Sequence, residues 1–360
     1  MRWSFSIGSL GGTQVRIHLT FLALVAWYAW LAMRDGGPGA AARATGFLLA
    51  LFFCILLHEF GHIRMARRFG VRTPEVILLP IGGVARLERM PDEPRQELLV
   101  ALAGPAVTAV IAALLWLALA LAGTSHGPEV LDQARMPFLP GLMWVNLYLL
   151  AFNLIPAFPM DGGRVLRALL AKRKGMVAGT RIAARIGQGF ALVLGLIGLT
   201  GSPVLVLIAG FIFLGAQAEA AAVETRAAGR GIRASQMMVT DFRVLRVHAT
   251  LRDASEVLLA GEQGEFPVVD NLGRLEGMLT RDLLIRALTD KGPDAPVGEA
   301  MVPLPALLRA DMSFETALEL LRRSGLPALP VVDHAGGLIG LVTMDNITDL
   351  LLVRRAAGGN

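Results

Sequence analysis

The chain of 360 residues carries little charge and a single cysteine, Cys54. One cysteine excludes an internal disulfide framework and leaves the redox compartment undetermined. Charged residues make up 18% of the sequence and hydrophobic residues 54%, whereas a soluble domain contains about 25% charged residues. This imbalance indicates that much of the chain lies in a lipid bilayer.

The N-terminus also lacks the short apolar core and small-residue cleavage site of a removed signal peptide. We therefore interpret the first apolar stretch as a retained membrane span. The net charge of +5 would suit nucleic acid as a partner, but the arginines flank apolar runs, which is typical of membrane topology. We expect a bilayer environment and no nucleic-acid partner.

Apolar residues crowd the first 220 positions, and positions 221–360 have the composition of a soluble domain. A bilayer-crossing helix needs about 20 mostly apolar residues. About six segments meet this requirement: 18–33, 44–66, 97–122, 141–159, 184–201 and 203–220. Polar side chains and two prolines interrupt the fourth segment, which predicts a backbone covered by protein or by a water-filled cavity.

Arginine and lysine predict the orientation of these spans. They are dense after the second span, in RMARRFGVR, and after the fourth, in RVLRALLAKRKG, but scarce in the links 34–43 and 123–140. Cationic loops stay on the cytoplasmic side of a membrane. We therefore predict a multi-pass protein of the cell membrane whose N-terminus and soluble tail are cytoplasmic.

A short β-hairpin is expected between the second and third spans. The runs EVILLP and VARLERM flank Gly82 and Gly83, which predicts a hairpin that turns at the two glycines. An apolar hairpin at the membrane edge offers unpaired strand groups that an extended polypeptide could join. Gly82 and Gly83 are therefore candidate substrate-binding residues.

The run CILLHEFGHI places His58, Glu59 and His62 inside the second expected span. Ionisable side chains in a membrane helix are costly and are typical of functional sites. A spacing of four puts both histidines on one helix face, where two imidazoles can bind one metal ion. Zinc lowers the pKa of bound water to about 7, and Glu59 is placed to move that proton. The alternative is a capping or packing cluster near the cytoplasmic interface.

A catalytic zinc usually has three protein ligands, so one more side chain is needed. His126 falls in an expected external loop, and His248 and His334 fall in the soluble tail. His18 begins the first span, where an interfacial anchor is the simpler interpretation. The best remaining candidate is Asp161 in NLIPAFPMDGGR, at the cytoplasmic end of the interrupted span. The alternative role of Asp161 is a helix N-cap.

Two further side chains, those of Asn153 and Cys54, belong to the same region. The amide of Asn153 could donate to the oxyanion of a tetrahedral intermediate or hold a substrate strand, or it could simply pack inside the protein. Cys54 precedes His58 by four residues and shares its helix face. A fourth protein ligand would close the metal site, so we interpret Cys54 as a small packing residue.

Four motifs in order, HEFGH, LLPIGGVARL, ELLVALAGPAVT and NLIPAFPMDGGRVLRALLA, resemble the site-2 proteases, which are intramembrane zinc metalloproteases of regulated intramembrane proteolysis. The resemblance covers about residues 10–220. It implies one zinc ion per chain and transmembrane proteins as substrates. Thr108 stands where many relatives have asparagine, so an amide contact is not expected there. Carried over by position, the motifs imply zinc ligands His58, His62 and Asp161, Glu59 as catalytic acid and base, and substrate binding by Asn153 and the hairpin glycines.

The soluble tail contains an internal repeat, because residues 264–288 match residues 326–351. Each copy has Pro-Val-Val-Asp, a glycine turn, a short apolar strand, and then threonine and a helix. The repeat resembles a pair of cystathionine-β-synthase (CBS) domains over about residues 233–353. The resemblance implies either an adenine-nucleotide site between the halves or a structural, dimerising module without ligand. The candidate nucleotide-binding residues are Thr280, Asp282, Thr343 and Asn346.

The expected architecture is a polytopic α-helical membrane domain with a short membrane-associated β-hairpin, followed by a soluble α/β tandem CBS module. The boundaries are 1–222 for the membrane domain, 223–234 for a linker, and 235–290 and 295–353 for the CBS domains. We predict an intramembrane zinc endopeptidase regulated by the CBS pair, with a homodimer through these domains as a further expectation. The alternative is a CBS-gated transporter of metal or other ions. The order of the motifs, and the lack of acidic residues repeated through the other spans, favour the protease.

Overall fold

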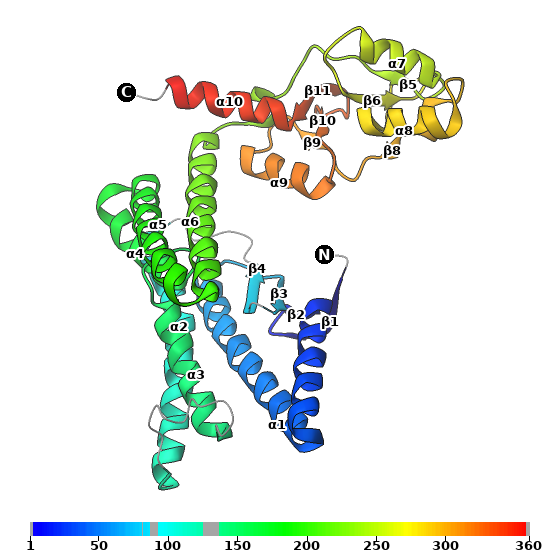
Figure 1. Cartoon of the computed structure of the whole chain (residues 1–360). Helices are drawn as coiled ribbons and strands as arrows, with labels where there is room; N and C mark the ends of the chain where they lie inside the picture. The colour runs from blue at the N-terminus through cyan, green and yellow to red at the C-terminus, as the bar shows by residue number, and fades with distance from the viewer. Residues whose placement is uncertain (1–2, 81, 87–92, 125–136, 358–360) are drawn as a thin grey trace. The chain divides into compact units, whose positions relative to one another are not determined.

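The computed structural model describes residues 3–80, 82–86, 93–124 and 137–357. The chain divides into two compact units, Met1–Val223 and Glu224–Asn360 (Figure 1). The first unit contains long apolar helices and one small sheet, and the second contains two small sheets with short helices. This division agrees with the change in composition near position 220.

The first two expected spans form one long helix with a sharp bend, α1 (Leu19–Arg68). Gly37 interrupts the helix at a φ of 71°, and Pro38 follows it. Glycine tolerates this left-handed conformation, and proline removes a backbone donor, so the bend lies where the sequence permits it. Figure 1 shows α1 as two arms that diverge from the bend. The expected link 34–43 is therefore helical on both sides of Gly37.

Among the described residues, four helices are long and apolar enough to cross a membrane: α1, α2 (Pro94–Leu121), α5 (Met176–Gly201) and α6 (Pro203–Gly229). The helix α3 (Phe138–Asn153) has 16 residues, about 24 Å at about 1.5 Å per residue, and is shorter than a hydrocarbon core of about 30 Å. The chain is a multi-pass membrane protein, and the count of about six spans remains a prediction.

The interrupted fourth span ends as a helix at Asn153, and α4 (Asp161–Lys174) begins after seven non-helical residues, 154–160. Pro156 and Pro159 lie in this connection and cannot donate a backbone hydrogen bond. The helix α6 continues to Gly229, into the residues assigned above to a linker.

The hairpin between the second and third expected spans is part of a larger sheet. Its strands β3 (Glu75–Leu79) and β4 (Gly82–Arg86) pair antiparallel, with Leu79 opposite Gly82. Gly82 and Gly83 both belong to β4 and pair with Leu79 and Leu78, so the prediction that they form the turn is wrong. Residues 87–90 of the expected second strand lie outside the described residues.

Two N-terminal strands that we did not predict, β1 (Ser4–Leu10) and β2 (Thr13–His18), complete this sheet in the order β1-β2-β3-β4. Strand β2 pairs parallel with β3, and the Thr13 hydroxyl donates to the Thr73 carbonyl at 2.6 Å. Within the described residues, β4 is an edge strand of the sheet.

The second unit contains two halves of the same topology. In the first half, β6 (Glu265–Val269) pairs parallel with β5 (Leu245–Arg246) and antiparallel with β7 (Leu275–Thr280). In the second half, β10 (Ala328–Val332) pairs in the same two ways with β9 (Leu308–Arg309) and β11 (Leu338–Thr343). The remaining elements are α7 (Leu251–Leu259), α8 (Arg281–Lys291), β8 (Val302–Pro303), α9 (Phe314–Ser324) and α10 (Met344–Ala357). The repeat seen in the sequence is therefore also a structural repeat.

Candidate metal centre

The two histidines of the HEFGH motif lie one turn apart on the second arm of α1, and both are buried. Their rings pack edge to face with centroids 4.8 Å apart, and their Nε2 atoms are 3.1 Å apart. The helical spacing of four residues therefore brings one nitrogen of each imidazole, on His58 and His62, to a common point.

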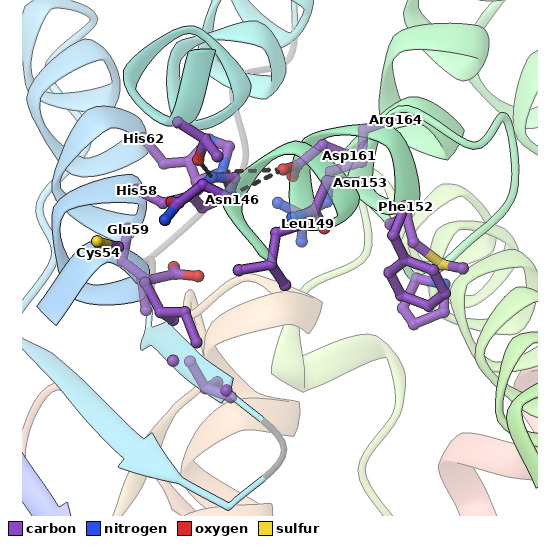
Figure 2. Close-up of a pocket in the computed structure, with 18 of the residues that line it drawn as sticks. Cys54, His58, Glu59, His62, Asn146, Leu149, Phe152, Asn153, Asp161 and Arg164 are labelled. Carbon is purple, nitrogen blue, oxygen red and sulfur yellow. Dashed lines mark hydrogen bonds and ion pairs between the residues drawn. The ribbon is translucent and has the colours of Figure 1, made fainter. Parts of the chain in front are cut away.

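Asp161 joins this pair from the first residue of α4. Its Oδ2 lies 3.2 Å from Nε2 of His58 and 3.2 Å from Nε2 of His62. The N-cap of α4 is Met160, so the alternative that Asp161 is the N-cap is wrong. Figure 2 shows the carboxylate facing the two imidazoles from the opposite wall of a cavity.

The donor set has the dimensions of a zinc site. In a tetrahedral zinc site with bonds of about 2.0–2.1 Å, neighbouring ligand atoms lie about 3.3 Å apart. The three ligand atoms here are separated by 3.1–3.2 Å. Within the described part of the chain, this His-His-Asp group is the cluster that can hold a metal ion. Two imidazoles and one carboxylate suit zinc, and they leave one tetrahedral position for a further ligand.

The helix α2 orients both imidazoles. Nδ1 of His62 is 2.7 Å from the carbonyl oxygen of Val100, and because a carbonyl only accepts, Nδ1 carries the proton and Nε2 keeps its lone pair. Nδ1 of His58 is 2.8 Å from the hydroxyl of Thr108, which itself donates to the Gly104 carbonyl at 3.4 Å. Such partners fix the ring orientation of metal-binding histidines. Thr108 thus contacts His58 through a hydroxyl instead of an amide.

Gly104 keeps the space beside the imidazoles open. A Cβ atom at this position would lie 2.1 Å from Nε2 of His62 and 2.7 Å from Nε2 of His58. Any larger residue would therefore fill the space next to the two nitrogens. The AGPAVT motif therefore requires glycine at position 104, because only a residue without a side chain leaves this space open.

Two more glycines let the chain place Asp161. A Cβ on Gly162 would lie 2.3 Å from the carbonyl oxygen of Ile155, and one on Gly163 would lie 2.6 Å from the backbone of Ala157. The Asp-Gly-Gly sequence therefore allows α4 to start directly against the non-helical connection that precedes it.

The cluster lies in a cavity of about 400 Å³ that also contains the other candidate residues of the membrane unit. Glu59 and Asn153 line it together with the three clustered side chains (Figure 2). Gly82 and Gly83 line it as well. Strand β4 approaches α1 closely here, because a Cβ on Gly83 would lie 2.7 Å from Cγ of Glu59. The structure therefore brings together the predicted base, the predicted metal ligands and both predicted substrate-binding elements.

Two polar side chains that line the cavity, those of Asn146 and Arg164, are not among the residues predicted from the sequence. Asn146 is buried on α3, donates to the Leu142 carbonyl at 2.8 Å, and lies two turns before Asn153. Arg164 lies one turn after Asp161 on α4 and also lines the cavity. Helical spacing from the candidates Asn153 and Asp161 is the signal that indicates both residues.

The remaining histidines and the cysteine lie elsewhere or in other roles. His18 is the N-cap of α1 and accepts from the Thr20 amide at 3.3 Å. Cys54 is buried on the same arm of α1 and lines the cavity, outside the His-His-Asp cluster. His248 and His334 belong to the second unit, and His126 lies outside the described residues.

In the second unit, the candidate nucleotide-binding residues occupy helix starts. Thr280 is the N-cap of α8, and its hydroxyl accepts from the Leu283 amide at 3.3 Å. Thr343 likewise accepts from the amide of Asn346 at 3.1 Å, at the start of α10. Asp282 lies in the first turn of α8. The two threonines therefore hold equivalent positions in the two halves, where they stabilise the helices.

Comparison with known proteins assigns the fold and the class of site. The profile of Peptidase family M50 matches residues 46–135 and 123–194, and that of the CBS domain matches residues 234–290 and 297–353. The chain is 34% identical to the zinc metalloprotease MJ0392 of Methanocaldococcus jannaschii over 78% of each chain. It is 30% identical to Rip3 of Mycobacterium tuberculosis, a protein named for a zinc metalloprotease activity, over 99% of this chain and 95% of that protein.

A site-2 protease structure from Methanocaldococcus jannaschii is 35% identical and covers 61% of this chain and 95% of that one, with a TM-score of 0.45. The protein is a membrane zinc metalloprotease that carries two CBS domains. The chain belongs to Peptidase family M50. This class of enzyme replaces the alternative of a CBS-gated transporter.

Proposed function

We propose that the chain is an intramembrane endopeptidase that hydrolyses a peptide bond in or near a transmembrane helix of a membrane-anchored substrate. One observation carries the proposal: Nε2 of His58, Nε2 of His62 and Oδ2 of Asp161 converge within 3.2 Å, and these three buried side chains line a cavity of the membrane unit. These three side chains are the proposed ligands of one zinc ion per chain.

Zinc, when bound to these ligands, supplies Lewis-acid activation of water and of the scissile carbonyl. Glu59 takes the proton from the attacking water and returns it to the leaving amine. It suits this role because it lies next to His58 and lines the cavity, but is not one of the three clustered ligands. Asn153, at the last turn of α3, donates its amide to the substrate backbone or to the developing oxyanion.

Strand β4 is the proposed docking strand for the substrate. A peptide bond inside a helix is shielded by its own hydrogen bonds, so the substrate must unwind before it can be hydrolysed. The edge strand β4 lies against Glu59, and Gly82, Gly83 and Val84 line the same cavity. An unwound segment that pairs with β4 would regain backbone hydrogen bonds beside the proposed base.

Proline at successive positions of β4 tests the docking role. Because N–H groups alternate between the two sides of a strand, one of Val84→Pro and Ala85→Pro removes a donor that faces the free edge. We expect that variant to lose cleavage while it keeps its zinc. Normal cleavage by both variants would refute the docking role.

The main test replaces Glu59 with glutamine, which is isosteric and cannot accept the proton. Full-length protein in detergent is given a transmembrane reporter substrate, and bound zinc is measured in parallel. We expect cleavage to fall by roughly 10²–10⁴-fold with the zinc content unchanged. Equal cleavage by the wild type and the variant would end the proposed mechanism, as would wild-type protein that neither binds zinc nor cleaves.

We further propose that the N-terminus and the CBS pair are cytoplasmic, because the arginine-rich segments follow the second and fourth expected spans. The single cysteine simplifies the test. In a Cys54→Ala background, Ser235→Cys places one thiol at an exposed site of the second unit. Labelling by a membrane-impermeant maleimide only after the cells are lysed supports the proposed orientation, and labelling of intact cells contradicts it.

The CBS pair is the proposed regulatory module, with Thr280, Asp282, Thr343 and Asn346 as candidate contacts for an adenine nucleotide. Both threonine hydroxyls accept from a helix amide and keep a proton to donate. Calorimetric titration of the full-length protein with ATP and AMP tests this role. Binding that Asp282→Ala weakens supports it, and no binding of either nucleotide would leave the pair a structural or dimerising module.

A further inference from the structure

Three charged side chains from three different helices meet inside the membrane unit. Arg167 of α4 is 2% exposed and Glu97 of α2 is 1% exposed. Nε of Arg167 donates to Oε1 of Glu97 at 2.6 Å, and Nη1 of Arg167 donates to Oε1 of Glu219 on α6. Glu97 and Arg167 lie within two of the quoted motifs, but the proposed chemistry assigns no role to either residue or to Glu219.

Stability alone is a weak reason for such a group. The desolvation of buried charges often exceeds what their pairing returns, and apolar replacements are frequently as stable. Two carboxylates share one guanidinium here, and Oε2 of Glu97 has no hydrogen-bond partner among the described residues. A better explanation for the buried charge of Arg167 is geometric: the planar guanidinium holds two carboxylates in fixed directions.

The two helices joined by Arg167 and Glu97 are those that complete the metal centre. Glu97 lies three residues before Val100, whose carbonyl accepts from His62. Arg167 lies six residues after Asp161 on α4. The contact between α2 and α4 therefore joins the helix that orients the imidazoles of α1 to the helix that carries the carboxylate.

Arg167 also holds the connection that leads to Asp161. Its guanidinium carbon lies 5.1 Å from the ring centre of Phe158, which is 1% exposed. The third helix packs on the same connection, because a Cβ on Gly215 of α6 would lie 2.8 Å from Pro159. One side chain thus contacts α2, α6 and the segment just before Asp161.

We propose that Arg167 is a positioning residue, which fixes Oδ2 of Asp161 at the distance from the imidazole pair that a zinc ion requires. The inference rests on the proposed zinc role of the cluster. Arg167 does not reach the cavity, and it acts only through the placement of α4 and of the preceding connection. Loss of its fork lets the carboxylate move relative to the two nitrogens and speeds the release of zinc.

The test measures how fast a chelator removes zinc from full-length Arg167→Lys and Arg167→Gln proteins, beside kcat and KM for a transmembrane reporter. We expect zinc release to be about 10-fold faster for lysine and up to about 100-fold faster for glutamine, in the range of other residues that orient metal ligands. Because chemistry depends on the metal and docking does not, kcat should fall while KM stays near the wild-type value.

Arg173→Gln is the matched control, an exposed arginine on the same helix, and should release zinc at the wild-type rate. If Arg167→Gln does not fold, Glu219→Gln keeps the Arg167–Glu97 pair and should still accelerate release, to a smaller extent. Folded Arg167 variants that release zinc like the wild type would overturn the inference while the proposed function stands. Wild-type protein without a tightly held zinc ion would instead overturn the proposed function.

Discussion

The two units of the chain fill their interiors in opposite ways. Of the eleven buried polar or charged side chains among the described residues, only Thr280 lies in the second unit. The second unit instead has apolar clusters of twelve and nine buried residues. The clusters confined to the membrane unit have at most four.

The difference follows from the surroundings of each unit. In water, burial of apolar surface drives folding, so the CBS halves place large side chains such as Phe266 and Phe314 at full burial. In lipid, apolar side chains gain little from burial, and Leu121, Leu199 and Leu207 point outward with more than 70% exposure. The interior of the membrane unit can therefore contain polar groups, and small residues allow its helices to pack closely.

The largest effect that separates the two units is expected for Asp161→Ala. Loss of one of three ligands should lower zinc affinity by more than about 100-fold, since residues that only orient a ligand are already worth roughly 10–100-fold. Cleavage should disappear with the metal. Amide hydrogen exchange in the second unit should not change, because its apolar clusters do not contain this residue. Retained zinc, or lost protection of the CBS halves, would contradict this separation.

The converse change is Phe314→Ala, in the larger apolar cluster of the second unit. Truncation of this fully buried phenylalanine to alanine should lower the free energy of unfolding of that half by about 3–5 kcal/mol. All five tryptophans lie in the first 223 residues, so tryptophan fluorescence does not report on the second unit. Hydrogen exchange of the second unit in the full-length protein measures the effect instead. Leu259→Ala, at 85% exposure, is the control and should change stability by less than about 0.5 kcal/mol. Zinc content that falls with Phe314→Ala would show that the two units are not independent.

A smaller effect is expected from one added methyl group beside the metal centre. In Gly104→Ala the Cβ would lie 2.1 Å from Nε2 of His62, so α2 or the imidazole must shift. We expect zinc affinity to fall by about 10–100-fold, as for other changes that disturb ligand orientation. Gly210→Ala on α6 meets nothing within 4 Å and should leave affinity unchanged. Equal affinities in the two variants would mean that the backbone of α2 yields without cost.

Much of the membrane site could be predicted because residues four positions apart on a helix share one face. The spacing of His58 and His62 fixes one face of a helix, and the structure places both imidazoles on it. Asp161 lies about one hundred residues away, but the prolines and glycines around it already indicated a break in a membrane segment. The structure places its carboxylate 3.2 Å from both imidazoles.

Other contacts were not predictable from one sequence. Every residue has a backbone carbonyl, so nothing singles out that of Val100 as the partner of His62. The pairing of Arg167 with Glu97 joins residues 70 apart and depends on how α2 and α4 pack. Strands β1 and β2 were missed because the apolar run that follows them dominated the interpretation. The Gly82-Gly83 pair predicts a turn, but the structure shows that the close approach of β4 to Glu59 is what requires Gly83.

The smallest expected effect concerns pH and the second unit alone. Burial raises the pKa of Glu265 on β6 above its usual value of 4.5, and the charge of Asp345 on α10 adds to the shift. The folded state therefore binds this proton more tightly than the unfolded state does. The contribution of the protonated Glu265 carboxyl to folding stability is fully present below about pH 4.5, and it is lost as pH rises through the pKa of the folded state. Hydrogen-exchange stability of the second unit should thus decline more steeply with pH in the wild type than in Glu265→Gln.

The comparison between these two proteins removes the pH dependence of the intrinsic exchange rates, which is the same for both. Asp345→Asn should weaken the decline without abolishing it, because burial is the larger cause. Zinc release should not differ between Glu265→Gln and the wild type, since the residue belongs to the unit that lacks the metal centre. Parallel pH profiles for the wild type and Glu265→Gln would show that the carboxyl titrates equally in both states. The second unit would then owe its pH response to other groups.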